Sequence, residues 1–387
     1  MREAAPARIG ALDVLRGLAI LGTFGANVWV FAIPGGALGF FAEGFRSGGF
    51  VEAALRLLVN GKFLALLTLL FGVGLELQYR SAVRRGLRWP GRYLVRASIL
   101  FVEGLLHYVL IFEFDVLMAY AITSVVVAYL IGRSERVVRT WMVGVGGGYV
   151  AVIGAATALV LWLPQGQGGQ SEVGPEVTAS WLDQVWWRLD QVLLLRFETV
   201  VIVPQATVLF LLGVRLLRAG AFDDSAAGAR IRSRLMLLGL GIGAPLNVLT
   251  ALGGDDWFLV DRYLVPPLVS LGLLGLVTHL VLHARRGPGP VRRGLAAVGR
   301  TALSCYVLPN LLASVLCYGW GLGLADRFAD LRPWWVVGLW FGVCVLCMVL
   351  ATLWLRWFDR GPLEIVMHRA MAPRPARKLT AHRVEHL

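Results

Sequence analysis

The sequence carries little charge for its length. Only 16% of its 387 residues are Asp, Glu, Lys or Arg, whereas 57% are hydrophobic. A soluble domain carries nearer ~25% charged residues, so this composition excludes an ordinary water-soluble fold. Many apolar runs instead approach or exceed the roughly 17–25 residues with which a helix crosses a bilayer. We therefore predict an all-α integral membrane protein.

Cysteine is also scarce. The four cysteines (Cys305, Cys317, Cys344 and Cys347) all lie inside apolar runs. The Cys344-x-x-Cys347 spacing is compatible with redox or metal chemistry, but no second pair or nearby histidine supports it. Packing in an apolar core is the favoured interpretation. We therefore expect no metal site.

Acidic residues are few, 24 against 37 Lys and Arg, which leaves a net charge of +13. The basic residues lie in short segments between apolar runs, with no large soluble region to present them to nucleic acid. We expect membrane lipids as partners and no nucleic acid. The basic residues concentrate in alternate segments, and this positive-inside pattern predicts that both termini are cytoplasmic. No cleavable signal is expected, because the first apolar run begins at a polar Asp13/Arg16 and more spans follow.

Ten transmembrane spans fit this alternation, because an even number returns both ends to the same side. We read residues 1–370 as one polytopic domain, divisible into helix groups 1–163 and 197–358 joined by the outer segment 164–196. A basic cytoplasmic tail follows at 371–387. The expected spans are 12–31, 57–77, 94–112, 116–131, 141–163, 197–214, 235–252, 263–283, 300–318 and 334–355.

The outer segment 164–196 contains a sequence typical of an amphipathic helix. Such a helix would lie on the outer surface of the membrane, anchored by its tryptophans, as an interfacial anchor or as a lid over an outer cavity. Its expected apolar face consists of Trp181, Val185, Leu189, Val192 and Leu193, with Asp183, Arg188 and Asp190 interleaved.

The first span carries four polar residues, Asp13, Arg16, Thr23 and Asn27, within an arc of about 80° on a helix. A polar stripe facing lipid is costly, so this face is expected to meet protein or a cavity. Asp13 and Arg16 are three residues apart and are expected to pair. In the alternative interpretation, Arg16 contacts the phosphates of an anionic ligand, a role that suits its planar guanidinium.

The third span repeats this pattern with Arg96, Glu103 and His107, which fall within about 40° of one another. Glu103 lies one turn from His107 and is positioned to orient its ring, as a general base requires. A satisfied core histidine is the structural alternative. Asp115 opens the next span, where it either orients the ring or caps a helix. Of the six histidines, only His107 is expected in the outer half of the membrane.

Further polar residues are expected inside the membrane as candidates for lining a cavity. For Lys62 the alternative is snorkelling to the interface. The candidates are Lys62, Tyr120, Asn247, Tyr306 and Asn310.

Six motifs are spread over nearly the whole chain. They are Asp13-Val-Leu-Arg16-Gly17, Asn60-Gly-Lys62-Phe-Leu, Gly104-Leu-Leu-His107, Asp115-Val-Leu, Gly243-Ala-Pro-Leu-Asn247 and Arg360-Gly-Pro-Leu-Glu364. Together they resemble one bacterial family, that of the YeiB-like membrane proteins (DUF418 type). The first motif is also similar to the opening of heparan-alpha-glucosaminide N-acetyltransferase and, more loosely, of other transmembrane acyltransferases.

This resemblance implies a multi-pass enzyme of the bacterial plasma (inner) membrane. It would move an acyl group from cytoplasmic acyl-CoA, such as acetyl-CoA, to a small-molecule or sugar acceptor outside, and the related enzymes suggest a homodimer. Arg16, with Asp13 and Arg96, would hold the donor. The active histidine of the heparan enzymes lies after the first span, but residues 32–56 contain no His. We assign the role of that histidine to His107 from its position alone, because no motif of the heparan enzymes matches there.

Two other functions fit the same residues. Buried ion pairs and proline breaks also suit a transporter or flippase for a small metabolite, lipid or antibiotic. Spans two and six end alike, in Leu69-Leu-Phe-Gly72-Val and Leu211-Leu-Gly213-Val, which hints at an internal repeat. A scaffold subunit is the third option, and it predicts no effect of substitutions at His107 or Asp115.

Overall fold

The computed structural model describes every residue except 1–3, 44–47, 163–177, 285–286 and 371–387. Within the described residues the chain is helical and contains no strand, so the predicted all-α class is confirmed. The expected basic tail, 371–387, lies outside them, as does most of the loop that precedes the predicted amphipathic helix.

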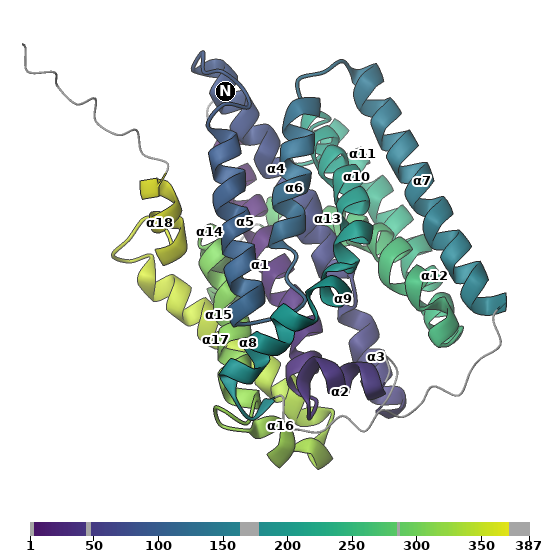
Figure 1. The fold of residues 1–387 in the computed structure, drawn as a ribbon. Helices are drawn as coiled ribbons and strands as arrows, with labels where there is room; N and C mark the ends of the chain where they lie inside the picture. Colours follow the sequence, from purple (N-terminus) through teal and green to yellow (C-terminus); the bar gives the residue numbers. More distant parts are fainter. Residues whose placement is uncertain (1–3, 44–47, 163–177, 285–286, 371–387) are drawn as a thin grey trace, which may run out of the picture.

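The described residues of the first half form nine α-helices (Figure 1). They are α1 (Ala4–Phe31), α2 (Gly36–Glu43), α3 (Gly49–Val59), α4 (Lys62–Arg84), α5 (Tyr93–Leu110), α6 (Leu117–Leu130), α7 (Glu135–Trp162), α8 (Trp181–Asp190) and α9 (Val192–Arg196).

The second half continues with α10 (Glu198–Arg218) and with α11 (Ala226–Met236), which a π-helical stretch at Leu237–Gly243 joins to α12 (Ala244–Leu252). The remaining helices are α13 (Pro266–Leu282), α14 (Pro290–Arg300), α15 (Ala302–Cys317), α16 (Leu324–Arg327), α17 (Trp334–Trp354) and α18 (Pro362–Ala370).

In the described part of the chain, eight helical stretches are long and apolar enough to cross a membrane. The number rises to nine if the bent pair α14–α15, whose axes meet at 100°, forms one span. All ten expected spans fall on helices. The difference from ten is α6, which has 14 residues, fewer than the roughly 17 that a span needs. Helix α6 packs among α4, α5 and α10 inside the bundle, and its residues are mostly buried.

Two glycines allow helices α4 and α10 to pack backbone against backbone. A Cβ added at Gly72 would lie 2.1 Å from the carbonyl oxygen of Phe210, and one added at Gly213 would lie 2.1 Å from that of Leu69. Small residues allow this approach, which is a common basis of helix packing in membranes. The similar endings of spans two and six therefore meet each other at one helix crossing.

We expect Gly72→Ala to destabilise the protein by about 1–3 kcal/mol, because the new methyl group must displace a backbone carbonyl. Gly74→Ala is the matched control on the same helix, since nothing lies within 4 Å of a Cβ at that position. Thermal unfolding in detergent measures both variants. Equal melting temperatures for the two would contradict the close α4–α10 contact.

Candidate functional site

His107 lies at the last turn of α5 and faces Asp115, which follows the short α5–α6 turn (residues 111–116). Its Nδ1 is 3.1 Å from Asp115 Oδ1, and both side chains are buried. Helix α5 ends at Leu110 and α6 begins at Leu117, so the turn folds back and brings the two residues together. The predicted association of His107 with Asp115 is therefore present.

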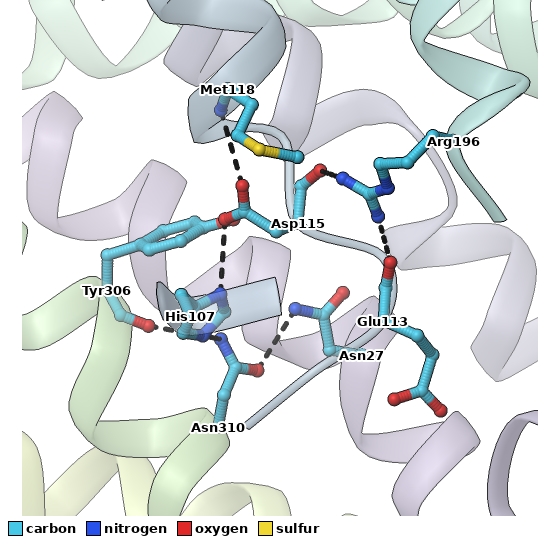
Figure 2. A network of polar contacts seen from close by, with 8 residues as sticks. All are labelled: Asn27, His107, Glu113, Asp115, Met118, Arg196, Tyr306 and Asn310. Carbon is cyan, nitrogen blue, oxygen red and sulfur yellow. Dashed lines mark hydrogen bonds and ion pairs between the residues drawn. The ribbon is translucent and has the colours of Figure 1, made fainter. Parts of the chain in front are cut away.

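A third residue completes the contacts of the His107 ring (Figure 2). The side-chain nitrogen of Asn310, on α15, lies 3.4 Å from His107 Nε2. The orientation of this amide is fixed, because Asn310 donates to the carbonyl of Tyr306 at 3.1 Å and its oxygen accepts from Asn27 at 3.1 Å. Asn310 therefore presents N–H to the ring, which assigns Nε2 as the acceptor and Nδ1–H as the donor to Asp115. The residues His107, Asp115, Asn310, Asn27 and Tyr306 form what we call the His107 cluster.

Asp115 holds two elements together. Its Oδ1 contacts His107 and lies 3.5 Å from the Tyr306 hydroxyl, while its Oδ2 accepts from the backbone N–H of Met118 at 3.3 Å. The second bond satisfies a free donor at the start of α6, as an N-cap does. The two roles considered for Asp115, orienting the ring and capping the helix, are therefore filled by different oxygens of one carboxylate.

Glu103 does not take part in this cluster. No hydrogen bond joins it to His107, and its buried Oε1 has no hydrogen-bond partner within the described residues. Helical spacing placed Glu103 and His107 on one face, but the α5–α6 turn places Asp115 closer to the ring. Of the two candidate carboxylates, Asp115 is the one that orients His107.

Two arginines from other helices, Arg188 on α8 and Arg196 on α9, hold the α5–α6 turn in place. Arg188, on α8, is 1% exposed and pairs with Glu113 at 3.1 Å. It also donates to the carbonyls of Val109 and Ile111, which the end of α5 leaves free. Arg196 donates to the carbonyls of Glu113 and Asp115. Glu113 and Arg196 were not predicted from the sequence, and neither was a partner for Arg188.

Helix α8 forms where an amphipathic helix was predicted. It buries Gln184 and Arg188 against the protein, whereas Leu182 and Trp186 are 59% and 68% exposed. The predicted face included Leu189 and Leu193, which also point outward. Arg188 faces the protein because the free carbonyls of the α5–α6 turn and Glu113 provide partners for its charge. The apolar side chains Leu182, Trp186 and Leu189 face outward.

A cavity of about 370 Å³ leads to the His107 cluster from the side on which α1 begins. Three arginines (Arg16, Arg96 and Arg300) line it together with Glu364, and much of the remaining lining consists of apolar side chains, many of them from α4, α5 and α6. Along α4 its lining runs from Gln78 to Leu67, about 16 Å at the helical rise. Tyr306 also lines this space, which we call the arginine cavity.

Arg16 is held in place at the arginine cavity. It contacts Asp13 at 3.3 Å, as predicted, and the carbonyl of Gly299 at 3.3 Å. Glu364 accepts from the backbone N–H groups of Leu303 and Ser304 and caps the start of α15. The predicted residues Arg16 and Arg96 thus line one cavity, together with Arg300 and Glu364. Asp13 does not line it and contributes by pairing with Arg16.

On its other side, Tyr306 borders a second, smaller cavity of about 30 Å³. Asn27 and Thr23 of α1 line this small cavity, together with Glu198 and Arg262, which form an ion pair at 3.2 Å. Tyr306 lines both spaces, and its ring centroid lies 5.4 Å from that of His107. The two cavities therefore meet at the His107 cluster.

Three of the predicted cavity residues lie outside the His107 cluster. Tyr120 is buried and contacts the Thr68 hydroxyl at 2.5 Å. Asn247 donates to Asp261 at 2.8 Å, and Lys62 donates to the carbonyl of Leu57. Lys62 is buried, so it does not snorkel to an interface. Asn247 and Lys62 belong to a separate polar group near the beginning of α4.

The four cysteines are free and buried, as expected for packing residues. Among the described residues, no group of three or more His, Cys, Asp or Glu side chains is arranged to hold a metal ion.

These features define a polytopic helical membrane protein with a buried His–Asp–Asn centre between two cavities. Residues 216–374 match the family described as "Protein of unknown function (DUF418)", and this part contains Arg300, Tyr306, Asn310 and Glu364. The chain is 25% identical to the uncharacterized protein YxaH of Bacillus subtilis (strain 168) over 386 residues, covering 92% of each chain. It is 26% identical to the uncharacterized protein YeiB of Escherichia coli (strain K12) over 384 residues, covering 91% of this chain and 93% of YeiB. These matches support an assignment to the YeiB-like DUF418 family. No solved structure matches it.

Proposed function

We propose that the protein is a membrane-embedded acyltransferase. It takes an acyl group from acyl-CoA at the arginine cavity and delivers it to an acceptor at the small cavity. The observation that carries this proposal is the position of Tyr306, which lines both cavities and contacts Asp115 of the buried His107 cluster. In the cell this requires both termini in the cytoplasm of a bacterial inner membrane, so that the arginine cavity meets the supply of acyl-CoA.

The lining of the arginine cavity suits the donor. Arg96 and Arg300 are exposed at its mouth and Arg16 is half-buried, which provides cations for the phosphates of the nucleotide. The apolar middle section, with Leu67, Leu70 and others, suits the less polar thioester arm. The donor's reactive carbon would then lie near Tyr306.

The His107 cluster supplies acid–base chemistry. An acceptor hydroxyl or amine attacks the thioester carbonyl while its proton passes to His107 Nε2, which takes it in place of the long contact with Asn310. The carbon–sulfur bond then breaks, and the thiolate of CoA leaves and takes up that proton. Asp115 holds Nδ1–H and stabilises the charged ring, as the acid of a catalytic triad does. Asn27 borders the small cavity, where its second amide N–H is suited to the oxyanion.

We expect Arg16→Gln to raise the KM for acetyl-CoA about tenfold with little change in kcat, because it removes a charge from the donor site and leaves the His107 cluster intact. Acetyl-CoA titration in nanodiscs, followed by release of free CoA, measures this. Arg139→Gln, an exposed position on α7, is the matched control and should leave KM unchanged. An unchanged KM for Arg16→Gln would place the donor elsewhere.

A transporter is the second candidate, favoured by the same arrangement of two cavities separated by one side chain. It predicts that a solute crosses the membrane without covalent change. Acyl transfer predicts free CoA and a modified acceptor in equal amounts, so a single product analysis separates the two functions.

A further inference from the structure

A third cavity lies beside the small cavity. It is a groove of about 500 Å³ between α1, the α3–α4 junction, α12, α13 and α17, and we call it the lateral groove. Its volume is within the range of small-molecule sites, and its walls are almost entirely apolar. They include Trp29, Phe63, Leu273 and Trp340.

The lateral groove opens toward the outside of the helix bundle. Two apolar side chains on its lining, Leu58 and Val248, are 66% and 47% exposed. Both belong to longer helical stretches, Gly49–Arg84 and Ala226–Leu252, that are long and apolar enough to cross a membrane, so the opening would face lipid and not water.

The same groove carries two polar side chains, Lys62 and Asn247. Asn247 is 1% exposed and donates to Asp261 Oδ1, which fixes the orientation of its amide. Its Oδ1 has no hydrogen-bond partner in the described residues. A buried, unpaired carbonyl oxygen is costly, and an N–H or O–H donor from a ligand would satisfy it.

The groove also adjoins the site. Val59 lines both the lateral groove and the small cavity, which lies against Asn27 and Tyr306. The three cavities therefore form a series, from the arginine cavity past Tyr306 to the small cavity, and past Val59 to the lateral groove.

We propose that the lateral groove binds the acceptor of the acyl group, and that this acceptor is an amphiphile with an apolar chain and a hydroxyl or amine head group. The chain occupies the groove from the lipid side, a donor group near the head satisfies Asn247 Oδ1, and the nucleophile reaches past Val59 to the His107 cluster. This inference rests on the proposed acyltransferase function for its chemistry, but the binding of an amphiphile can be tested without it.

The test uses a photoactivatable dodecanol that carries a diazirine, with the full-length protein in nanodiscs. We expect labelling of the peptides that contain residues 55–63 and 244–248. Val248→Trp fills the groove and should reduce this labelling at least fivefold. Leu249→Trp is the matched control, because Leu249 is 65% exposed and does not line the groove. Val337→Trp, which fills the groove from α17, is a second blocking variant.

Activity provides the second readout. Val248→Trp should lower the ratio of the acetyl-transfer rate to dodecyl glucoside over that to methyl glucoside at least fivefold relative to Leu249→Trp, because only the first acceptor needs the groove. Equal labelling in Val248→Trp, Val337→Trp and Leu249→Trp overturns the inference, even if acetyl transfer occurs. Groove labelling without release of CoA would instead support the binding site and overturn the acyltransferase.

Discussion

Replacement of His107 by Gln should lower the rate of acyl transfer about 10²–10⁴-fold, the usual contribution of a general acid–base group. Gln is similar in size and polar, so it fills the buried position next to Asp115 and Asn310. It has no nitrogen that can take a proton near neutral pH. The measurement is release of CoA from acetyl-CoA in nanodiscs, with dodecyl glucoside as the acceptor.

The control for this variant is His283→Gln, an exposed histidine that follows α13. It should leave the rate unchanged. If His107→Gln folds, as judged by its melting temperature, and still transfers at the rate of the unmodified protein, His107 is structural and the scaffold interpretation is favoured.

Asp115→Asn should cause a similar loss, about 10²–10⁴-fold, by a different route. An Asn amide donates to His107 Nδ1 and forces the proton onto Nε2, so the atom that must accept the acceptor's proton is blocked. In Ser–His–Asp hydrolases the same exchange lowers turnover about 10⁴-fold. The side-chain oxygen of Asn still accepts from Met118, so the start of α6 is preserved.

The effects of Asp115→Asn on turnover and on donor binding can be measured separately. Asp115→Asn should lower kcat and leave the KM for acetyl-CoA unchanged, because Asp115 does not line the arginine cavity. Asp183→Asn, an exposed position on α8, is the control. A higher KM with an unchanged kcat in Asp115→Asn would show that the carboxylate acts on donor binding and does not position the histidine.

The sequence predicted the parts of the site that are near each other in the chain. His107 and Asp115 are eight residues apart, and a polar pair at the junction of two apolar runs indicated their importance. Asp13 and Arg16 were paired by helical spacing alone, and they do pair. The ten apolar runs located the helices because length and hydropathy determine where a chain can cross lipid.

The sequence could not predict contacts that depend on the tertiary fold. Asn310 and Tyr306 were identified as polar residues in an apolar run, but their approach to His107 depends on how α15 packs against α1. Glu103 was one of two candidate partners of the ring because it lies on the same helix, whereas the α5–α6 turn brings the other candidate, Asp115, to the ring. The partners of Arg188 could not be predicted for the same reason, since the free carbonyls that it contacts arise only when α5 ends at Leu110.

The central claim is that an acyl group, and not a whole molecule, passes from the arginine cavity through the His107 cluster to an acceptor. It is tested most directly in sealed vesicles that contain the protein, with acetyl-CoA radiolabelled on the acetyl group supplied on one side only. Our account predicts labelled acceptor on the opposite side and an equal amount of free CoA on the supply side, both abolished in His107→Gln. Intact labelled acetyl-CoA or unmodified acceptor moving across the vesicle membrane, with no free CoA released, would contradict it.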